Sequence, residues 1–229
     1  MWNISVTGLQ TTKCHNMLVI GAKGLAKELL EVLLQNKELD NLVFYDDLNS
    51  EAPEHLYGRF PVLKSEREAK AYLFGRDARF TIGIGNPQLR KMIYDRFSSY
   101  SSHITSVISK GAEIGSFGVR IGVGCNILAG VKISNDVQIG MGCLIYYNSI
   151  ITHDVQIGDF VEISPGATLL GRCRVGSYTQ IGSGAILLPD VTVGSNVVVA
   201  AGAVVTADLP DNVMAAGVPA VIRKQRTPQ

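Results

Sequence analysis

Aliphatic residues recur at every sixth position through the second half of the chain. Four residues after each of them stands a smaller, uncharged residue, such as Cys125, Val131 or Ala167. A period of six fits neither an α-helix nor a single strand. It predicts short strands joined by tight corners, with three sides to a coil of 18 residues. The aliphatic positions are Ile121, Ile127, Ile133, Ile139, Ile145, Ile151, Ile157, Ile163, Leu169, Val175, Ile181, Leu187, Val193, Val199 and Val205.

These coils predict a parallel β-helix over about residues 103–206, with the aliphatic side chains inside and the smaller ones filling the corners. Coils stack through backbone hydrogen bonds at a spacing of about 4.8 Å. Glycine often follows the aliphatic residue, as at Gly140 and Gly158, where we expect the turn to need a permissive backbone. Ile108 and Ile114 fit an earlier coil whose phase differs by one residue. Packing of flat outer faces between subunits would add to the core, so we expect an oligomer.

The first half of the chain alternates short apolar strands with helical segments. This order predicts a small Rossmann-like parallel α/β domain, which binds ligands at the carboxyl ends of its strands. We therefore expect an extension at 1–16, a nucleotide-sugar-binding domain at 17–102, and a coil domain at 103–224 with a tail at 207–229. The predicted strands are 16–20, 42–45 and 80–85, and the predicted helices are 26–35, 64–73 and 88–97.

A glycine turn, Gly21-Ala22-Lys23-Gly24, follows the first predicted strand. It lacks the full G-x-G-x-x-G fingerprint, because Lys23 stands where the second glycine would let a pyrophosphate approach the backbone. A plain strand-to-helix turn explains it equally well. The acidic pair Asp46 and Asp47, some twenty residues later, favours a nucleotide or nucleotide sugar.

Composition narrows the class of protein further. The 229 residues carry a net charge of only +1 and are 46% hydrophobic, with basic residues scattered along the chain. This argues against nucleic acid as the main partner. The chain shows neither a secretion signal nor an apolar run long enough to span a bilayer, which favours a cytoplasmic enzyme without membrane insertion.

The four cysteines show neither paired nor metal-ligand spacing. Cys125, Cys143 and Cys173 occupy the small inward positions of the coil, so we expect buried structural thiols and no metal site. Cys14 lies in the N-terminal extension and supports no inference about function.

His153 is the candidate catalytic residue of the coils. It follows the inward Ile151 by two positions and therefore stands at a corner, outside the core. A solvated polar corner is an equally simple explanation of its position alone. Histidine is suited to proton transfer near neutral pH, and the adjacent Asp154 is placed to orient the ring. Gly171 follows 18 positions later, so its amide should stack beside His153 and stabilise an oxyanion. This coincidence favours a general base.

The chain resembles the bacterial sugar O- and N-acetyltransferases of the hexapeptide-repeat class that carry an N-terminal nucleotide-binding domain. The resemblance is strongest to N-acetyltransferases of UDP-linked 4-amino-4,6-dideoxy sugars and to sialic acid O-acetyltransferases, and it implies that the parallel β-helix is left-handed. The segments that carry it are Met17–Gly24, Tyr45–Asp47, Ile84–Asn86 with Arg90, His153–Phe160, Ile163–Ala167, Ala201–Thr206 and Ala216–Ala220.

The resemblance implies a homotrimer that binds acetyl-CoA between neighbouring β-helices. It implies that His153 takes the acceptor's proton and that Asp154 increases its basicity. Glu162, Gly171, Ser183 and Ala201 match positions at acetyl-CoA, and the basic tail of Arg223, Lys224 and Arg226 is placed either to meet its phosphates or simply to be solvated. The positions that match the nucleotide-sugar site are Lys23, Gly24, Leu25, Asp46, Asp47, Gly85 and Tyr146.

Three residues depart from the family pattern. Leu25 and Glu162 replace histidines, and Tyr146 replaces an asparagine, so the identity of the sugar stays open. The favoured hypothesis is N-acetylation of a nucleotide-linked 4-amino-dideoxy sugar, with UDP as the expected nucleotide. The alternative is O-acetylation of a sugar hydroxyl, such as that of sialic acid.

A third class of function is a β-helix that transfers no acyl group. A zinc enzyme of this fold needs several histidines on adjacent coils, whereas His153 is the only histidine after His103. A purely structural coil would have no use for His153.

Overall fold

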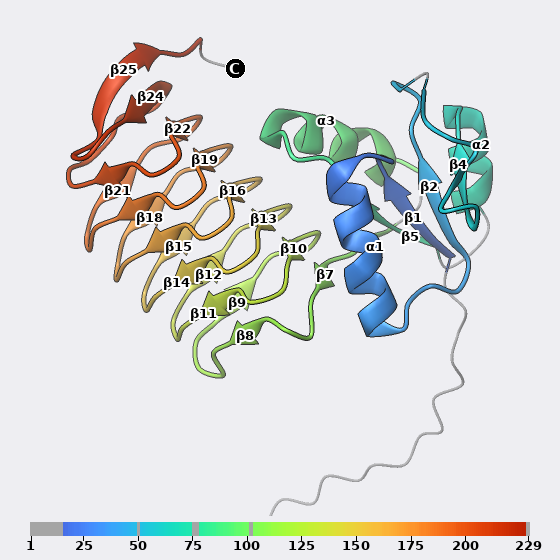
Figure 1. Cartoon of the computed structure of the whole chain (residues 1–229), viewed down its shortest axis with the longest axis horizontal. Coiled ribbons are helices and arrows are strands. Elements are labelled where there is room, and N and C mark those ends of the chain that lie inside the picture. Colours follow the sequence, from blue (N-terminus) through green and yellow to red (C-terminus); the bar gives the residue numbers. More distant parts are fainter. Residues whose placement is uncertain (1–15, 50, 75–77, 101–102, 228–229) are drawn as a thin grey trace, which may run out of the picture.

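The computed structural model describes residues 16–49, 51–74, 78–100 and 103–227. A small α/β domain lies beside a stack of coils, as predicted (Figure 1). The predicted fold class, a Rossmann-like domain followed by a left-handed parallel β-helix, is confirmed. Of the predicted extension, all but Asn16 lies outside the described residues, and so does Cys14.

The N-terminal domain is built on a six-stranded sheet with the order β3-β4-β2-β1-β5-β6. The first strand, β1, pairs in parallel with β2 on one side and β5 on the other, which makes the carboxyl end of β1 a topological switch point. The strands are β1 Asn16–Ile20, β2 Leu42–Tyr45, β3 His55–Leu56, β4 Phe60–Leu63, β5 Ala78–Ile82 and β6 His103–Ile104; the helices are α1 Gly24–Asn36, α2 Glu66–Leu73 and α3 Pro87–Ser98.

Local sequence explains where these helices begin. Ser65 and Glu68 form a capping box at the start of α2, and the Asn86 side chain caps α3, which has Pro87 in its first turn. The third predicted strand ends earlier than expected, at Ile82. Gly83 then lets α1 approach, because a Cβ there would lie 2.9 Å from the Ala26 Cα and Cβ. The β3–β4 hairpin was not predicted from the sequence.

The coils form three parallel sheets, here called faces 1, 2 and 3. The predicted tail also contains structure, since β24 extends face 1 and β25 folds back antiparallel against it. Face 1 comprises β7 Val107–Ile108, β10 Asn126–Ile127, β13 Leu144–Ile145, β16 Glu162–Ile163, β19 Gln180–Ile181, β22 Val198–Val199, β24 Val213–Ala216 and β25 Val221–Gln225. Face 2 comprises β8 Glu113–Ile114, β11 Lys132–Ile133, β14 Ile150–Ile151, β17 Thr168–Leu169, β20 Ile186–Leu187 and β23 Val204–Val205. Face 3 comprises β9 Arg120–Ile121, β12 Gln138–Ile139, β15 Gln156–Ile157, β18 Arg174–Val175 and β21 Thr192–Val193.

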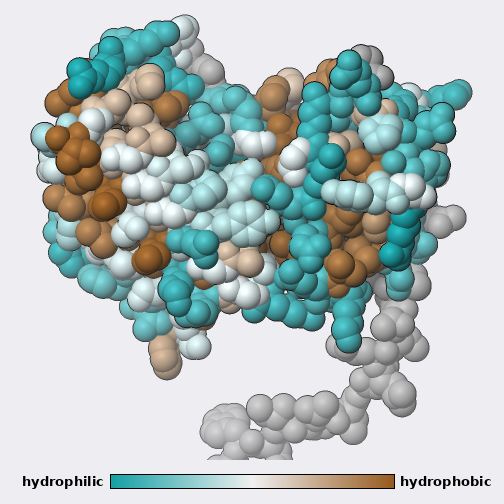
Figure 2. Space-filling view, viewed as in Figure 1, coloured by the Kyte–Doolittle hydropathy of each residue, from teal (hydrophilic) through white to brown (hydrophobic). Residues whose placement is uncertain are grey.

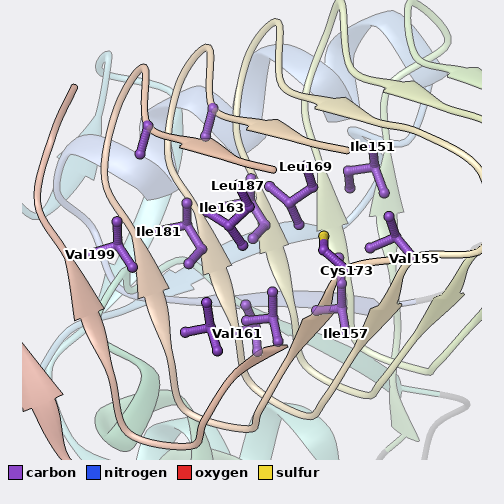
Figure 3. Packing of buried hydrophobic residues seen from close by; sticks show 14 of the residues in the cluster. Ile151, Val155, Ile157, Val161, Ile163, Leu169, Cys173, Ile181, Leu187 and Val199 are labelled. Atoms are coloured by element: carbon purple, nitrogen blue, oxygen red, sulfur yellow. The ribbon is translucent and has the colours of Figure 1, made fainter. Parts of the chain in front are cut away.

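The interior of the coil is a continuous aliphatic column (Figure 3). Ile151 and Leu169 point into it from face 2 and Ile163 points into it from face 1, and all three are at most 1% exposed. The smaller set of residues is buried with them, which confirms the predicted division between large and small inward positions. Cys125, Cys143 and Cys173 are buried free thiols, as predicted. Burial raises the pKa of Cys173 to about 12, so this thiol is not a nucleophile near neutral pH.

Each corner from Ile121 to Val199 has a left-handed residue three positions after the inward aliphatic one, such as Asp154 with φ 61°. Gly140 and Gly158 do not adopt this conformation, so our explanation of the glycines that follow the aliphatic residues was wrong. They are required by close stacking. A Cβ on Gly140 would lie 2.6 Å from the carbonyl group of Gly158 in the next coil.

One extra residue shifts the phase of the first coil, as the sequence indicates. Ile114 pairs with Ile133, 19 positions later, whereas Ile121 pairs with Ile139, 18 positions later. The extra residue therefore lies in the corner between β8 and β9. From Ile121 onward, the paired registers keep the offset of 18 as far as Val205.

The N-terminal domain packs on face 1 of the coil. Val107, Leu128 and Leu144 join its hydrophobic cluster. The side-chain oxygen of Asn126 accepts a hydrogen bond from the Thr81 hydroxyl at 3.0 Å, and its amide donates to the Ile82 carbonyl at 2.9 Å. The chain crosses between the domains after β6, which pairs with β5 in the N-terminal sheet.

Arg90 of α3 joins the two domains. It is 2% exposed and donates hydrogen bonds to the carbonyls of Gly142, Phe160 and Val161 in the coil and of Gly85 in the N-terminal domain. Burial lowers the pKa of this guanidinium. Because four main-chain carbonyls surround it, Arg90 fixes the carboxyl end of β5 against one corner of the coil.

On the surface, hydrophobic residues gather along the outer side of the coil, away from the N-terminal domain (Figure 2). Within the described ranges, no helix is both long and apolar enough to cross a membrane.

The division between inward and outward positions can be tested on one strand. We expect Ile157→Ala, which removes a side chain that is 5% exposed, to lower the free energy of unfolding by about 2–5 kcal/mol in urea titrations. Gln156→Ala, at the exposed neighbouring position of β15, is the control and should change it by less than about 0.5 kcal/mol. Equal losses from the two variants would contradict the assignment.

Candidate active site

His153 lies at the corner between faces 2 and 3, after β14. Its Nδ1 is 2.8 Å from Oδ2 of Asp154, and the two side chains are 55% and 53% exposed. Asp154 adopts the left-handed conformation that the corner requires, which aspartate tolerates better than most residues. When the carboxylate accepts a hydrogen bond from Nδ1–H, Nε2 is the ring nitrogen whose lone pair can take a proton.

Gly171 stacks against the His153 ring, as the 18-residue spacing predicts. A Cβ on Gly171 would lie 2.6 Å from Cε1 and 2.7 Å from Nε2 of His153. The main chain is held from both sides, since Arg172 N–H donates to the His153 carbonyl and Asp190 N–H to the Gly171 carbonyl. The Gly171 N–H has no acceptor in the described part of the chain. An amide donor is thus available beside Nε2.

A second feature is a pocket of about 400 Å³ at the carboxyl ends of β1, β2 and β5. Five of the predicted nucleotide-sugar residues line it together: Lys23, Leu25, Asp46, Gly85 and Tyr146. Tyr146 belongs to the coil, so the pocket lies between the two domains. Its other lining residues include Gly21 and Ala22, which belong to the predicted glycine turn. The remaining ones, which were not predicted as site residues, are Leu48, Asn49, Gly83, Ile84 and Leu89.

Two predicted residues of this group occupy other positions. Gly24 is the first residue of α1 and borders the pocket without lining it. The Asp47 carboxylate accepts a hydrogen bond from the Tyr45 hydroxyl at 2.5 Å and lies 3.4 Å from Arg96, away from the pocket lining. Asp46 is engaged by the main chain, since its carboxylate accepts from Ala22 N–H at 3.2 Å and Asn49 N–H at 3.1 Å. It holds the glycine turn at the pocket.

The predicted acetyl-CoA residues are divided between different parts of the coil. Gly171 is at the His153 corner, whereas Ser183 and Ala201 are exposed at the corner between faces 1 and 2. Glu162 is on face 1. Tyr146 also lies at the corner between faces 1 and 2. Within a single chain, His153 and the pocket are therefore separated by the width of face 2.

The basic tail lies on β25 and just beyond it. Lys224 and Arg226 line a shallow cavity of about 340 Å³ together with Met214 and Val198. The Arg226 guanidinium donates to the Asn196 carbonyl at 3.1 Å. Among the described residues, no group of three or more His, Cys, Asp or Glu side chains is arranged to hold a metal ion.

Both parts of the chain match known families. Residues 16–97 match the PglD N-terminal domain, and residues 136–171 and 172–207 match the bacterial transferase hexapeptide (six repeats). A comparison with curated proteins gives no significant match.

Among solved structures, PerB from Caulobacter crescentus, in complex with CoA and GDP-perosamine, is 30% identical, with a TM-score of 0.81 over 91% of this chain and 97% of PerB. The chain belongs to the hexapeptide-repeat sugar acetyltransferases. The acetyltransferase domain of PglB from Neisseria gonorrhoeae is 29% identical to this acetyltransferase, with a TM-score of 0.84 over 91% of this chain and 100% of that domain. WeeI from Acinetobacter baumannii is 27% identical, with the same TM-score and the same coverage.

The contact between Gly171 and His153 yields a prediction for this acetyltransferase. We expect Gly171→Ala to displace the imidazole and to lower kcat/KM at least about 10-fold, because small misplacements of a catalytic group are costly. Steady-state kinetics would measure this loss.

Gly111→Ala is the matched control, since a Cβ there meets Ala129 and Ser109 only at 3.5 Å, an ordinary contact. The control should retain its activity, and both variants should keep their melting temperature within a few degrees. Full activity of Gly171→Ala would show that the ring is not constrained by this glycine.

Proposed function

We propose that this acetyltransferase transfers the acetyl group of acetyl-CoA to the amino group of a 4-amino sugar linked to a nucleoside diphosphate. The observation that carries the proposal is the combination of an outward-facing His153–Asp154 pair with a pocket at the switch point of a nucleotide-binding fold. Support for the two ligands comes from PerB, solved with CoA and GDP-perosamine, and from the PglB domain, solved with acetyl-CoA. UDP is the nucleotide that we expect from the family resemblance, with GDP as the alternative.

The proposed reaction is a direct transfer. The amine lone pair attacks the thioester carbonyl, and Nε2 of His153 takes the proton that the nitrogen loses. The Asp154 carboxylate stabilises the imidazolium that forms. The Gly171 N–H donates to the oxygen of the tetrahedral intermediate. This intermediate collapses as the C–S bond breaks, and the thiolate of coenzyme A leaves and takes up a proton.

We further propose that the site is completed between subunits of a homotrimer. His153 and the pocket flank face 2, whose outward residues from β14 onward are uncharged: Ile150, Thr168, Ile186 and Val204. Ile150 is 40% exposed. A cyclic trimer packed through this face would bring the His153 corner of one subunit to the corner of its neighbour that carries Tyr146, Ser183 and Ala201. Acetyl-CoA would then lie in the cleft between the two coils.

O-acetylation of a sugar hydroxyl is the second candidate, because the same base would deprotonate a hydroxyl. The choice between the two depends on the acceptor and not on His153. Release of coenzyme A thiol with a 4-amino nucleotide sugar, and its absence with the matching 4-hydroxy sugar, would support N-acetylation. The reverse result would establish the O-acetyltransferase.

Removal of the proposed base tests the mechanism. We expect His153→Ala to lower kcat by about 10²- to 10⁴-fold, the usual contribution of a general base. The assay is thiol release from acetyl-CoA with UDP- and GDP-linked 4-amino sugars. His55→Ala, which changes an exposed histidine on β3, is the control and should keep full activity. Turnover of His153→Ala close to that of the unmodified enzyme would refute the mechanism.

The composite site can be tested by mixing subunits. His153→Ala lacks the base, and Gly85→Phe fills the pocket with a ring, since the nearest atom to a Cβ at Gly85 is 4.0 Å away. Each variant alone should be inactive. In randomly mixed trimers, about a quarter of the sites would combine an intact base from one subunit with an intact pocket from the next. Recovered activity would support the proposal, whereas a site contained in one subunit would show none.

A further inference from the structure

The pocket has one end suited to an anion. It adjoins the N-terminus of α1, a helix of 13 residues, whose N-cap Lys23 makes no side-chain capping hydrogen bond. The free N–H groups of the first turn and the positive end of the helix dipole favour phosphate there. The Lys23 ammonium adds to this positive potential. This end of the pocket is therefore suited to the phosphates of a nucleoside diphosphate.

Tyr146, the coil residue of the pocket lining, lies near two carboxylates, Glu28 on α1 and Glu162 on face 1 of the coil. Burial, together with the charges of Glu28 and Glu162, raises the pKa of Tyr146, while the Arg90 guanidinium acts in the other direction. Glu28 interacts with the Tyr146 side chain, and burial raises the pKa of this carboxyl.

Glu162 is the member of this group that a ligand can still pair with. Its two carboxylate oxygens accept hydrogen bonds from Ser164 at 3.2 Å and from Gln180 at 3.0 Å, which fix its direction. Oε2 would lie 4.0 Å from a Cβ on Gly85, a residue of the pocket lining.

Among the described residues, no cation forms an ion pair with this carboxylate. None of the ion pairs between described residues includes the half-buried Glu162. The guanidinium of Arg90, the nearby buried cation, donates to main-chain carbonyls instead. A partly desolvated carboxylate is more favourable when it is paired. Glu162 lies against Gly85, which lines the pocket, so a cationic group of a ligand in the pocket could reach it.

We propose that Glu162 determines the acceptor specificity of this enzyme, by binding the positively charged amino group of the sugar beside Tyr146. This inference rests on the proposed N-acetyltransferase function and names the residue that selects an amine over a hydroxyl. The two ends of the pocket then orient the substrate, with the diphosphate at α1 and the amino group toward the coil.

The carboxylate has a second effect during the reaction. The bound ammonium group first releases one proton to solvent, which gives the neutral amine its lone pair. As this amine attacks the thioester, its nitrogen becomes positively charged again until a second proton passes to Nε2 of His153 of the neighbouring subunit. Glu162 stabilises that charge without taking the proton. A sugar hydroxyl develops no comparable charge, and its oxygen lone pairs would face a carboxylate. Glu162 therefore favours the amine both in binding and in the transition state.

The test is a comparison of binding with two probes that differ in one group. Isothermal titration of the full chain would use a nucleoside-diphosphate 4-amino sugar and the matched sugar with a 4-hydroxyl, each in its UDP and GDP form. We expect the unmodified enzyme to bind the amine about 10- to 100-fold more tightly, as a hydrogen bond to a charged group allows. Glu162→Gln should reduce this ratio to about 3-fold or less, whereas Glu162→Asp, which keeps the charge, should retain part of it.

Glu31→Gln makes the same chemical change at an exposed position of α1 and should leave the ratio unaltered. If Glu162→Gln still acetylates the amine and keeps the full binding ratio, Glu162 does not select the acceptor, while the proposed function stands. If the unmodified enzyme acetylates neither amino sugar, the proposed function fails, and the role of Glu162 fails with it. Thiol release measured on the same preparations distinguishes the two results.

Discussion

The backbone register of the coil is the constraint on which the rest of the structure depends. From β9 to β23, the two-residue strands that pair on each face lie 18 positions apart, and each corner turns through one left-handed residue. This repeat places Gly171 against His153 and Gln180 against Glu162, although neither pair is close in sequence. Because parallel hydrogen bonds hold the main chain on both sides, a side chain at a corner is positioned by a rigid main chain. The aliphatic column makes that register unique, since a slip of one residue would turn the inward side chains outward.

The N-terminal domain takes its position from the same frame. Arg90 reaches across the boundary to carbonyls of two neighbouring coils, and Asn126 offers its amide to the end of β5. These contacts hold the glycine-rich edge of the parallel sheet against face 1 of the coil. The pocket thus has one wall made by a nucleotide-binding fold and another made by the coil through Tyr146. In the proposed function, the nucleotide would contact the N-terminal domain and the sugar would contact the coil.

Periodic features of the sequence predicted the fold well, because a six-residue repeat leaves few alternatives. The contact of Gly171 with His153 was predicted from the same repeat, because the two residues are 18 positions apart. The pocket was predicted only in part. Lys23, Asp46 and Gly85 follow strands and are therefore recognisable, whereas Leu48, Asn49 and Leu89 stand in loops or a first helical turn without a pattern.

Other features could not be predicted from the sequence, for specific physical reasons. The place of Asp47 depends on Tyr45 and Arg96, and no rule of spacing shows that pairing. The role of Arg90 depends on burial between domains, which local sequence does not encode. The glycines after the aliphatic residues were correctly noticed but wrongly explained, since steric space and not backbone freedom requires them.

The extra residue in the corner between β8 and β9 has an evolutionary consequence. It lies before the coils that carry His153 and Gly171, so the entire later stack moves together and keeps its internal alignment. A lineage can therefore lengthen or shorten such a protein by whole coils, or by loops that bulge from a corner, without disturbing the chemistry. Any other insertion or deletion inside a side of the triangle would rotate every downstream residue to a new direction. Gene duplication in units of one coil is thus the route of growth that selection leaves open to this architecture.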